Sequence, residues 1–178
     1  MIIVQKIVEF LKRKRLEEVN KNIKGRLLDI ACGDNTLVKK YHKDGIGLDV
    51  FNYFNNVDLV VKNSGEIPLE NESFDTITII AALNHIPKYK ETLTESLRLL
   101  NNGGKIIITM PIGWPQKIWH KIAHDYDDDQ VYRGINEDEE RYSMPIKEIK
   151  EALKEVGYKN IKTKPFLFGL NNIIIAEK

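Results

Sequence analysis

The chain has 178 residues, of which 42% are hydrophobic and 30% are charged, and this size and balance allow one globular domain with a good core. Its formal net charge of +1 excludes a strongly basic or acidic field over the whole molecule, so charge gives no indication of a nucleic-acid partner. Cys32 is the only cysteine, which excludes a disulfide framework and a cysteine-based zinc site and favours a reducing compartment.

The first residues contain a short apolar stretch that Gln5, Lys6 and Glu9 interrupt. This pattern lacks the long apolar region and the small-residue cleavage site of a signal peptide. No part of the sequence approaches the roughly 18 consecutive apolar residues that a transmembrane helix needs. We therefore expect a cytoplasmic protein.

From the N-terminus onward, helix and strand patterns alternate along the chain. Apolar residues recur at helical spacing over 2–22, 36–42, 88–101 and the stretch from Ile146 to Gly157. Short apolar or β-branched runs predict strands over 26–31, 45–50, 57–61, 74–82 and 105–110, and a final hairpin made of 159–168 and 171–178. This order predicts an α/β fold: a Rossmann-like, doubly wound, mainly parallel seven-stranded sheet with a C-terminal antiparallel hairpin.

Two segments depart from this alternation. Residues 111–144 hold two prolines, both tryptophans and a dense run of acids, which indicates a substrate-side insertion within a single domain that spans 1–178. Only seven residues separate Asp49 and Val57, too few for a crossover helix, so a plain loop must join the flanking strands. Sheets of this kind bind ligands beyond the carboxyl ends of their strands, near the switch point beside the first strand.

The loop after the first predicted strand, within LLDIACGDN, has the composition of a ligand-binding turn. Gly33 has no Cβ, so the backbone there can approach a ligand closely. Ala31 and Asn35 stand where glycine would be most common; alanine is small, and asparagine tolerates left-handed geometry. Asp29 precedes Gly33 by four residues, and its carboxylate can face a cationic group of the ligand.

Asp49 ends the second predicted strand, sixteen positions after Gly33. An acid at this place can accept hydrogen bonds from both hydroxyls of a ribose. An ordinary turn aspartate is the alternative, but the combination with the preceding loop favours ribose binding.

Four stretches follow one another at regular spacing: DIACGDN, GLDV, NSGEIPLENESFDTITIIAALNHI and LRLLNNGGKIIITMP. Together they resemble the class I S-adenosylmethionine (SAM) dependent methyltransferases, particularly the small type-11-like group. The first is similar to the family's glycine-rich SAM loop and the second to its strand with the acidic ribose ligand. The third and fourth are similar to its Leu-Pro, Ser-Phe-Asp and histidine region and to its Leu-x-x-Gly-Gly element. The resemblance covers 24–112 well and 145–178 loosely.

The resemblance implies which residues hold SAM, whose product is S-adenosylhomocysteine. The Gly33 loop carries the methionine part, with Asp29 near its amino end, and Asp49 binds the ribose. Asn63 stands where the family has an acid that accepts from the adenine amino group. Phe51 either covers the adenine or packs against the sheet edge. The implied cofactor-binding residues are Asp29, Ala31, Cys32, Gly33, Asn35, Asp49, Val50, Phe51, Asn63, Ser64, Gly65, Ala81, Ala82 and Leu83.

SAM already carries an activated methyl group, so the protein must chiefly bind it, align an acceptor and exclude water. His85, directly after the fourth predicted strand, is the candidate general base, with a structural role as the alternative. The candidates to line the acceptor pocket are Trp114, Trp119 and Tyr142, with packing of the insertion onto the core as the alternative. His120 and His124 have a spacing that metal ligands can use, but the HExxH pattern is absent, and we predict no metal site.

We expect a small-molecule acceptor, because eight acids lie within 125–140 and, as a lid near the acceptor site, would repel the phosphates of RNA. A solvated loop is the alternative for this segment. The basic run at 12–15 favours the alternative of an RNA or protein acceptor. A non-catalytic, SAM-binding regulatory or accessory subunit is a further alternative, favoured by the short chain and the missing crossover helix. A nicotinamide dehydrogenase is disfavoured because the loop lacks a GxGxxG pattern. We expect a monomer or homodimer, with no membrane or nucleic-acid partner indicated.

Overall fold

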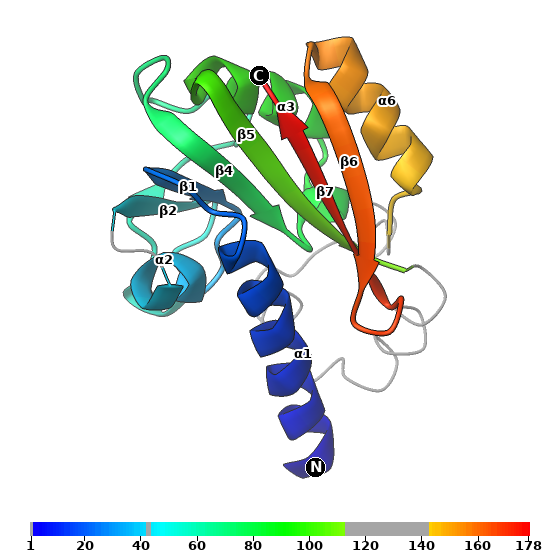
Figure 1. Cartoon of the computed structure of the whole chain (residues 1–178). Helices are drawn as coiled ribbons and strands as arrows, with labels where there is room; N and C mark the ends of the chain where they lie inside the picture. The colour runs from blue at the N-terminus through cyan, green and yellow to red at the C-terminus, as the bar shows by residue number, and fades with distance from the viewer. Residues whose placement is uncertain (1, 42–43, 113–142) are drawn as a thin grey trace.

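The computed structural model describes residues 2–41, 44–112 and 143–178 of the chain (Figure 1). The predicted acceptor residues Trp114, Trp119 and Tyr142 lie outside this part, as do the two histidines considered above as metal ligands and the acidic 125–140 segment. Within the described residues, no helix is both long and apolar enough to cross a membrane.

Seven strands form one sheet: β1 (Leu27–Ile30), β2 (Gly45–Asp49), β3 (Leu59–Val60), β4 (Phe74–Ile80), β5 (Leu100–Pro111), β6 (Lys159–Phe166) and β7 (Asn171–Glu177). Their order across the sheet is β3-β2-β1-β4-β5-β7-β6. Neighbouring strands from β3 to β5 pair in parallel, whereas β7 pairs antiparallel with both β5 and β6. This arrangement confirms the predicted Rossmann-like sheet with its C-terminal antiparallel hairpin.

Helices cover both faces of the sheet (Figure 1). They are α1 (Ile2–Asn20), α2 (Thr36–Tyr41), α3 (Tyr89–Leu99) and α6 (Ile146–Val156), with the short 3-10 helices η1 (Tyr53–Asn55) and η2 (Leu83–His85). Buried side chains of α1 and α2 pack with Ile107 on one face, and those of α3 and α6 pack with Ile106 and Ile108 on the other. Consecutive isoleucines of β5 serve different cores because side chains along a strand alternate between the two faces.

The strand after α3 begins earlier than the sequence predicts. The periodicity predicts a helix over 88–101 and a strand over 105–110, but α3 ends at Leu99 and β5 begins at Leu100. The backbone of Leu100 is extended (φ −69°, ψ 136°) and pairs with Phe74, and its side chain is fully buried. Burial against the sheet therefore overrides the local helical pattern at this residue.

A loop that contains η1 joins β2 to β3, in agreement with the short spacing in the sequence. Tyr53 anchors this loop, because its side chain is only 1% exposed. Phe51 and Phe54 on either side of it remain exposed, so this edge of the sheet keeps aromatic side chains at its surface.

The chain reverses its direction across the sheet at β1. From β1 it passes to β2 and β3 on one side, and it then returns to β4 on the other side. The connections after β1 and β4 therefore leave the carboxyl edge in opposite directions, which is the arrangement in which open α/β sheets bind ligands.

Candidate cofactor site

Several residues in the loop after β1 have a left-handed backbone conformation. Ala31, Gly33 and Asn35 have φ angles of 56°, 57° and 60°, and Ala81 at the end of the neighbouring β4 has a φ of 52°. Only glycine adopts this region at no cost, so the two alanines hold local strain that the surrounding fold must sustain. Such strain concentrates at functional sites, and here it lies at the carboxyl ends of the two central strands.

Asn35 fixes the end of this loop to the segment that precedes β3. Its side chain is fully buried, and its amide nitrogen donates to the Asn56 carbonyl (3.0 Å) and the Asp58 carboxylate (2.7 Å). The Asp58 carboxylate also accepts from the backbone N–H of Gly47 in β2 (2.8 Å). A Cβ at Gly47 would collide with the Asn35 side chain, so this contact requires glycine. These polar contacts hold the 51–58 loop in place where a crossover helix is missing.

Asp49 at the end of β2 is 1% exposed and binds the backbone of both neighbouring loops. One carboxylate oxygen accepts from the N–H of Gly33 (2.9 Å), and the other accepts from Val50 (2.7 Å) and Phe51 (3.2 Å). Carboxylate oxygens accept from hydroxyls as well as from N–H groups, so Asp49 has the chemistry that a ribose ligand requires. Asp49 thus holds Gly33 and the start of the 51–58 loop together.

Asp29 lies within β1 and is 3% exposed. Burial raises the pKa of its carboxyl group to about 7; the hydrogen bond from the Thr78 hydroxyl acts in the opposite direction, and the nearby Asp49 and Asp34 charges add to the rise. A carboxyl group in this state gains most from an added cation, because the cation offsets both desolvation and the like charges. The primary amine of SAM has the matching charge.

Cys32 lies in the loop after β1, between Asp29 and Asp49 in the sequence, and its side chain stays a neutral thiol. Burial raises its pKa well above the usual range, and the charges of Asp29, Asp49 and Asp58 act in the same direction. The backbone N–H of Cys32 donates to the Leu48 carbonyl (3.0 Å), which ties the loop to β2. Its predicted place beside the cofactor therefore calls for packing and not for nucleophilic chemistry.

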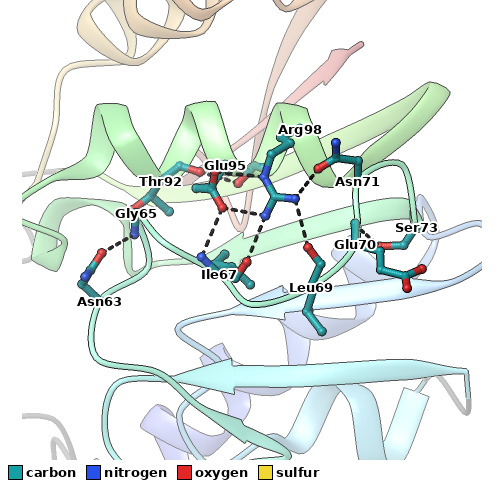
Figure 2. Close-up of polar contacts among 11 residues, drawn as sticks. Asn63, Gly65, Ile67, Leu69, Glu70, Asn71, Ser73, Thr92, Glu95 and Arg98 are labelled. Carbon is teal, nitrogen blue, oxygen red and sulfur yellow. Dashed lines mark hydrogen bonds and ion pairs between the residues drawn. The ribbon is translucent and has the colours of Figure 1, made fainter.

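The segment after β3 contributes the residues predicted to contact adenine. The side-chain oxygen of Asn63 accepts from the Gly65 N–H (2.9 Å), which closes a tight turn (Figure 2). The Ser64 hydroxyl is buried and bonds to the Thr92 hydroxyl of α3 (2.8 Å). These contacts leave the Ser64 side chain facing α3, so its backbone is the part available to a ligand.

The end of β4 supplies a mostly buried wall. Ala82 is 9% exposed and Leu83 is fully buried. The side-chain amide nitrogen of Asn84 lies 3.0 Å from Nε2 of His85, and an amide donor there requires an unprotonated Nε2. The contact fixes the orientation of the ring, as the structural alternative for His85 requires.

Phe51 is 39% exposed and meets the buried Tyr53 edge-on, with ring centroids 4.9 Å apart. The ring is therefore held against the sheet edge while part of it stays accessible. Both predicted uses of Phe51, packing and covering an adenine, are compatible with this position.

The residues at the carboxyl ends of β1 and β2 fit the cofactor that the sequence implies. A Cβ built at Gly33 would meet nothing within 4 Å, so open space lies on that side of the loop. Asp29 and Asp49 are both buried at these strand ends, and the ionised form of each has the charge opposite to that of SAM. Across the described ranges, no three His, Cys, Asp or Glu side chains come together in a group that could hold a metal ion.

Several residues that organise this site are missed by sequence reasoning. Thr78 and Asp58 carry no motif; they are found only when β4 is placed beside β1 and the 51–58 loop beside β2. Glu95 and Arg98 do have a signal, because acid and base three residues apart on a helix form ion pairs. Their contacts to the segment before β4 have no such signal in the sequence.

Comparison with known proteins places the chain in a family. The family model described as a methyltransferase domain matches residues 4–163. A demethylmenaquinone methyltransferase from Bacillus cytotoxicus is 30% identical over 172 residues, which cover 86% of this chain and 68% of that protein. The enzyme of the same name from Bacillus mycoides is 32% identical over 127 residues, but the match covers 64% of this chain and 53% of that protein.

The fold is also similar to those of solved methyltransferase structures. A SAM-dependent methyltransferase from Thermotoga maritima superimposes with a TM-score of 0.71 at 16% identity, and the match covers 100% of both chains. That similarity concerns the fold alone, whereas the family model and the 30% identical relative extend to the sequence. With its strand order and its carboxyl-edge acids, the chain belongs to the class I SAM-dependent methyltransferase family.

Proposed function

We propose that this chain transfers the methyl group of SAM to a small-molecule acceptor. The main support is the arrangement of Asp29, Gly33 and Asp49 at the switch point of the sheet. These residues belong to β1, to its loop and to β2. Their left-handed loop, open side and buried acids suit a cationic nucleoside.

The residues divide the binding between them. Asp29 faces the amine of the methionine part, where a positive charge lowers the pKa of its carboxyl group and restores the ionised form. Asp49 accepts the ribose hydroxyls while it holds Gly33 in place. Asn63, Ser64 and Gly65 form the adenine side. These roles, and those of the remaining predicted cofactor residues, are proposals.

The chemistry asks little more of the chain. Bound SAM supplies a methyl group on a sulfonium, which is activated without help from an acid or a metal. The wall formed by Ala81, Ala82 and Leu83 excludes water, and alignment of an acceptor there can lower the barrier by several kcal/mol (~7 or more in well-oriented systems). For His85 to act as a base, Nε2 must exchange its contact with Asn84 for the acceptor proton.

Two findings support a small-molecule acceptor. The relatives compared above are demethylmenaquinone methyltransferases by name, and a quinone is a small molecule. The acidic 125–140 sequence would disfavour an RNA acceptor. Trp114, Trp119 and Tyr142 remain the acceptor residues that the sequence predicts, within an insertion at 111–144 of a single domain.

The test is transfer of a radiolabelled methyl group from SAM into an extract of the source cells, which is then separated into small-molecule, RNA and protein fractions. We expect label in the small-molecule fraction. Label in RNA or protein would contradict the acceptor class. Tight SAM binding without transfer to any fraction would favour the accessory-subunit alternative, and failure to bind SAM would contradict the cofactor assignment.

A further inference from the structure

The 63–71 segment, which leads from β3 to β4, is fastened to one face of α3. Three residues of that helix at intervals of three make the contacts: Thr92, Glu95 and Arg98 (Figure 2). Residues at this spacing lie on one side of a helix, one above the other. The segment therefore follows α3 for about two turns, an estimate from 3.6 residues per turn.

Arg98 makes the largest number of these contacts. Its guanidinium donates to the carbonyls of Ile67 (2.9 Å) and Leu69 (2.9 Å) and to the side-chain oxygen of Asn71. It also binds both carboxylate oxygens of Glu95 (2.8 and 3.0 Å). The planar fork of arginine is thus satisfied on all sides, which a lysine ammonium cannot reproduce.

Glu95 extends the same network toward the cofactor site. One of its oxygens accepts from the backbone N–H of Ile67 (3.1 Å), so the acid and the arginine hold the N–H and the carbonyl of one residue. The Glu95 side chain is 17% exposed and that of Arg98 is 31% exposed. The hydrogen bond between them lowers the pKa of Glu95 and raises that of Arg98, so the pair stays ionised at neutral pH.

The near end of the segment is the turn formed by 63–65. The Ser64 hydroxyl bonds to Thr92, and the Gly65 backbone lies so close to α3 that a Cβ there would meet Glu91 at 3.0 Å. The side-chain oxygen of Asn63 points to the Gly65 N–H and takes its direction from this turn (Figure 2). A change in how the segment lies on α3 would move Asn63 and the Ser64 backbone together.

We propose that Arg98 and Glu95 are positioning residues for adenine recognition. They hold the 63–65 turn in the position from which it contacts the adenine amino group. The inference rests on the proposed function, because it takes 63–65 as the adenine side of a SAM site. Both side chains bind the backbone of Ile67, and Arg98 also binds that of Leu69, so they act on the 63–65 turn through the rest of the segment. The polar network on α3 sets the selectivity of the site for its base.

The experiment measures dissociation constants by calorimetry for S-adenosylhomocysteine and for its analogue without the 6-amino group, with the full chain and with Arg98→Lys. We expect the wild type to prefer S-adenosylhomocysteine at least tenfold and Arg98→Lys to lose most of that preference. Thr92→Val removes the hydroxyl that binds Ser64 and the Lys88 carbonyl. It gives a milder loss and serves as the second variant where Arg98→Lys does not fold. Lys90→Ala is the matched control on the same helix, since the Lys90 ammonium pairs with Glu155 of α6.

The ratio of the two constants separates positioning from simple destabilisation, which would weaken both ligands equally and leave the ratio unchanged. A preference retained in Arg98→Lys and Thr92→Val would overturn the inference while the proposed function stands, and so would a wild type that binds both ligands equally. A wild type that binds neither ligand would instead overturn the proposed function.

Discussion

At the scale of single residues, the two acids of the site differ in their surroundings. Asp49 accepts three backbone N–H groups, whereas Asp29 has a hydroxyl partner and two neighbouring carboxylates. Asp49 is therefore part of the frame of the loop even without a ligand. Asp29 instead gains an oppositely charged partner when a cation binds, so its burial lowers the stability of the protein without ligand and favours binding of the cation.

Replacement of Asp49 by Asn tests the first role. An amide nitrogen cannot accept a hydrogen bond, so one of the groups now bound to Asp49 loses its acceptor, at a cost of about 1–3 kcal/mol. We expect the dissociation constant for S-adenosylhomocysteine to rise at least tenfold in calorimetry. Asp44→Asn is the control, because Asp44 lies before β2 with a side chain 76% exposed. Equal affinity in wild type and Asp49→Asn would remove Asp49 from the site.

Replacement of Asp29 by Asn tests the second role through pH. The folded protein keeps the Asp29 proton up to a pH of about 7, whereas the unfolded chain releases it near the ordinary pKa of 3.8. The folded state binds more protons in that window, so the Asp29 contribution to the free energy of unfolding falls as the pH rises from about 4 to about 7. The amide introduced by Asp29→Asn does not titrate, and its oxygen can still accept from the Thr78 hydroxyl.

We therefore compare the free energies of unfolding of Asp29→Asn and the wild type at pH 5 and pH 8. Between these pH values, the difference should move in favour of Asp29→Asn by roughly 1–3 kcal/mol, given about 1.4 kcal/mol per pKa unit. Urea unfolding at the two pH values measures this. The same variant should bind S-adenosylhomocysteine more weakly. A stability difference that does not change with pH would show that Asp29 titrates normally.

At the scale of elements, most of the strands and helices could be predicted because their patterns are local. The six-residue run KIIITM and the spacing before Gly157 each identify one element, and the structure ends both elements within one residue of the predicted end. The start of β5 at Leu100 was not predictable, since it depends on pairing with Phe74 from a distant part of the chain. For the same reason, nothing local predicts that the 63–71 segment lies on α3.

The end of β4 allows a matched test of strain between neighbours. Ala81 has a φ of 52°, whereas Ala82 has a φ of −123°. We expect Ala81→Gly to stabilise the protein, by about 1 kcal/mol, because glycine adopts positive φ freely. Ala82→Gly should destabilise it, through lost packing and greater freedom of the unfolded chain. Thermal melting of both variants measures the difference; a lower melting temperature for both would contradict strain at Ala81.

At the scale of the whole molecule, the sheet order and the family of the chain could be predicted because motif spacing and alternation determine the topology. The acceptor cannot be predicted in this way, since sites on one fold serve many substrates. The sequence also predicts the cofactor residues only as a set. The structure adds how Asn35, Asp49 and Asp58 hold the loops of this set to one another.

We expect SAM to bind at the carboxyl edge of the sheet, and amide chemical shifts during titration with S-adenosylhomocysteine test this position most directly in a protein of 20.6 kDa. We predict that the amides of 31–35, 49–51 and 63–65 at the carboxyl edge shift together with one dissociation constant. The amides of Gly25 and Gly103, at the amino edge of the sheet, should not move. Shifts centred on the amino edge, or none at saturating ligand, would contradict binding at the carboxyl edge.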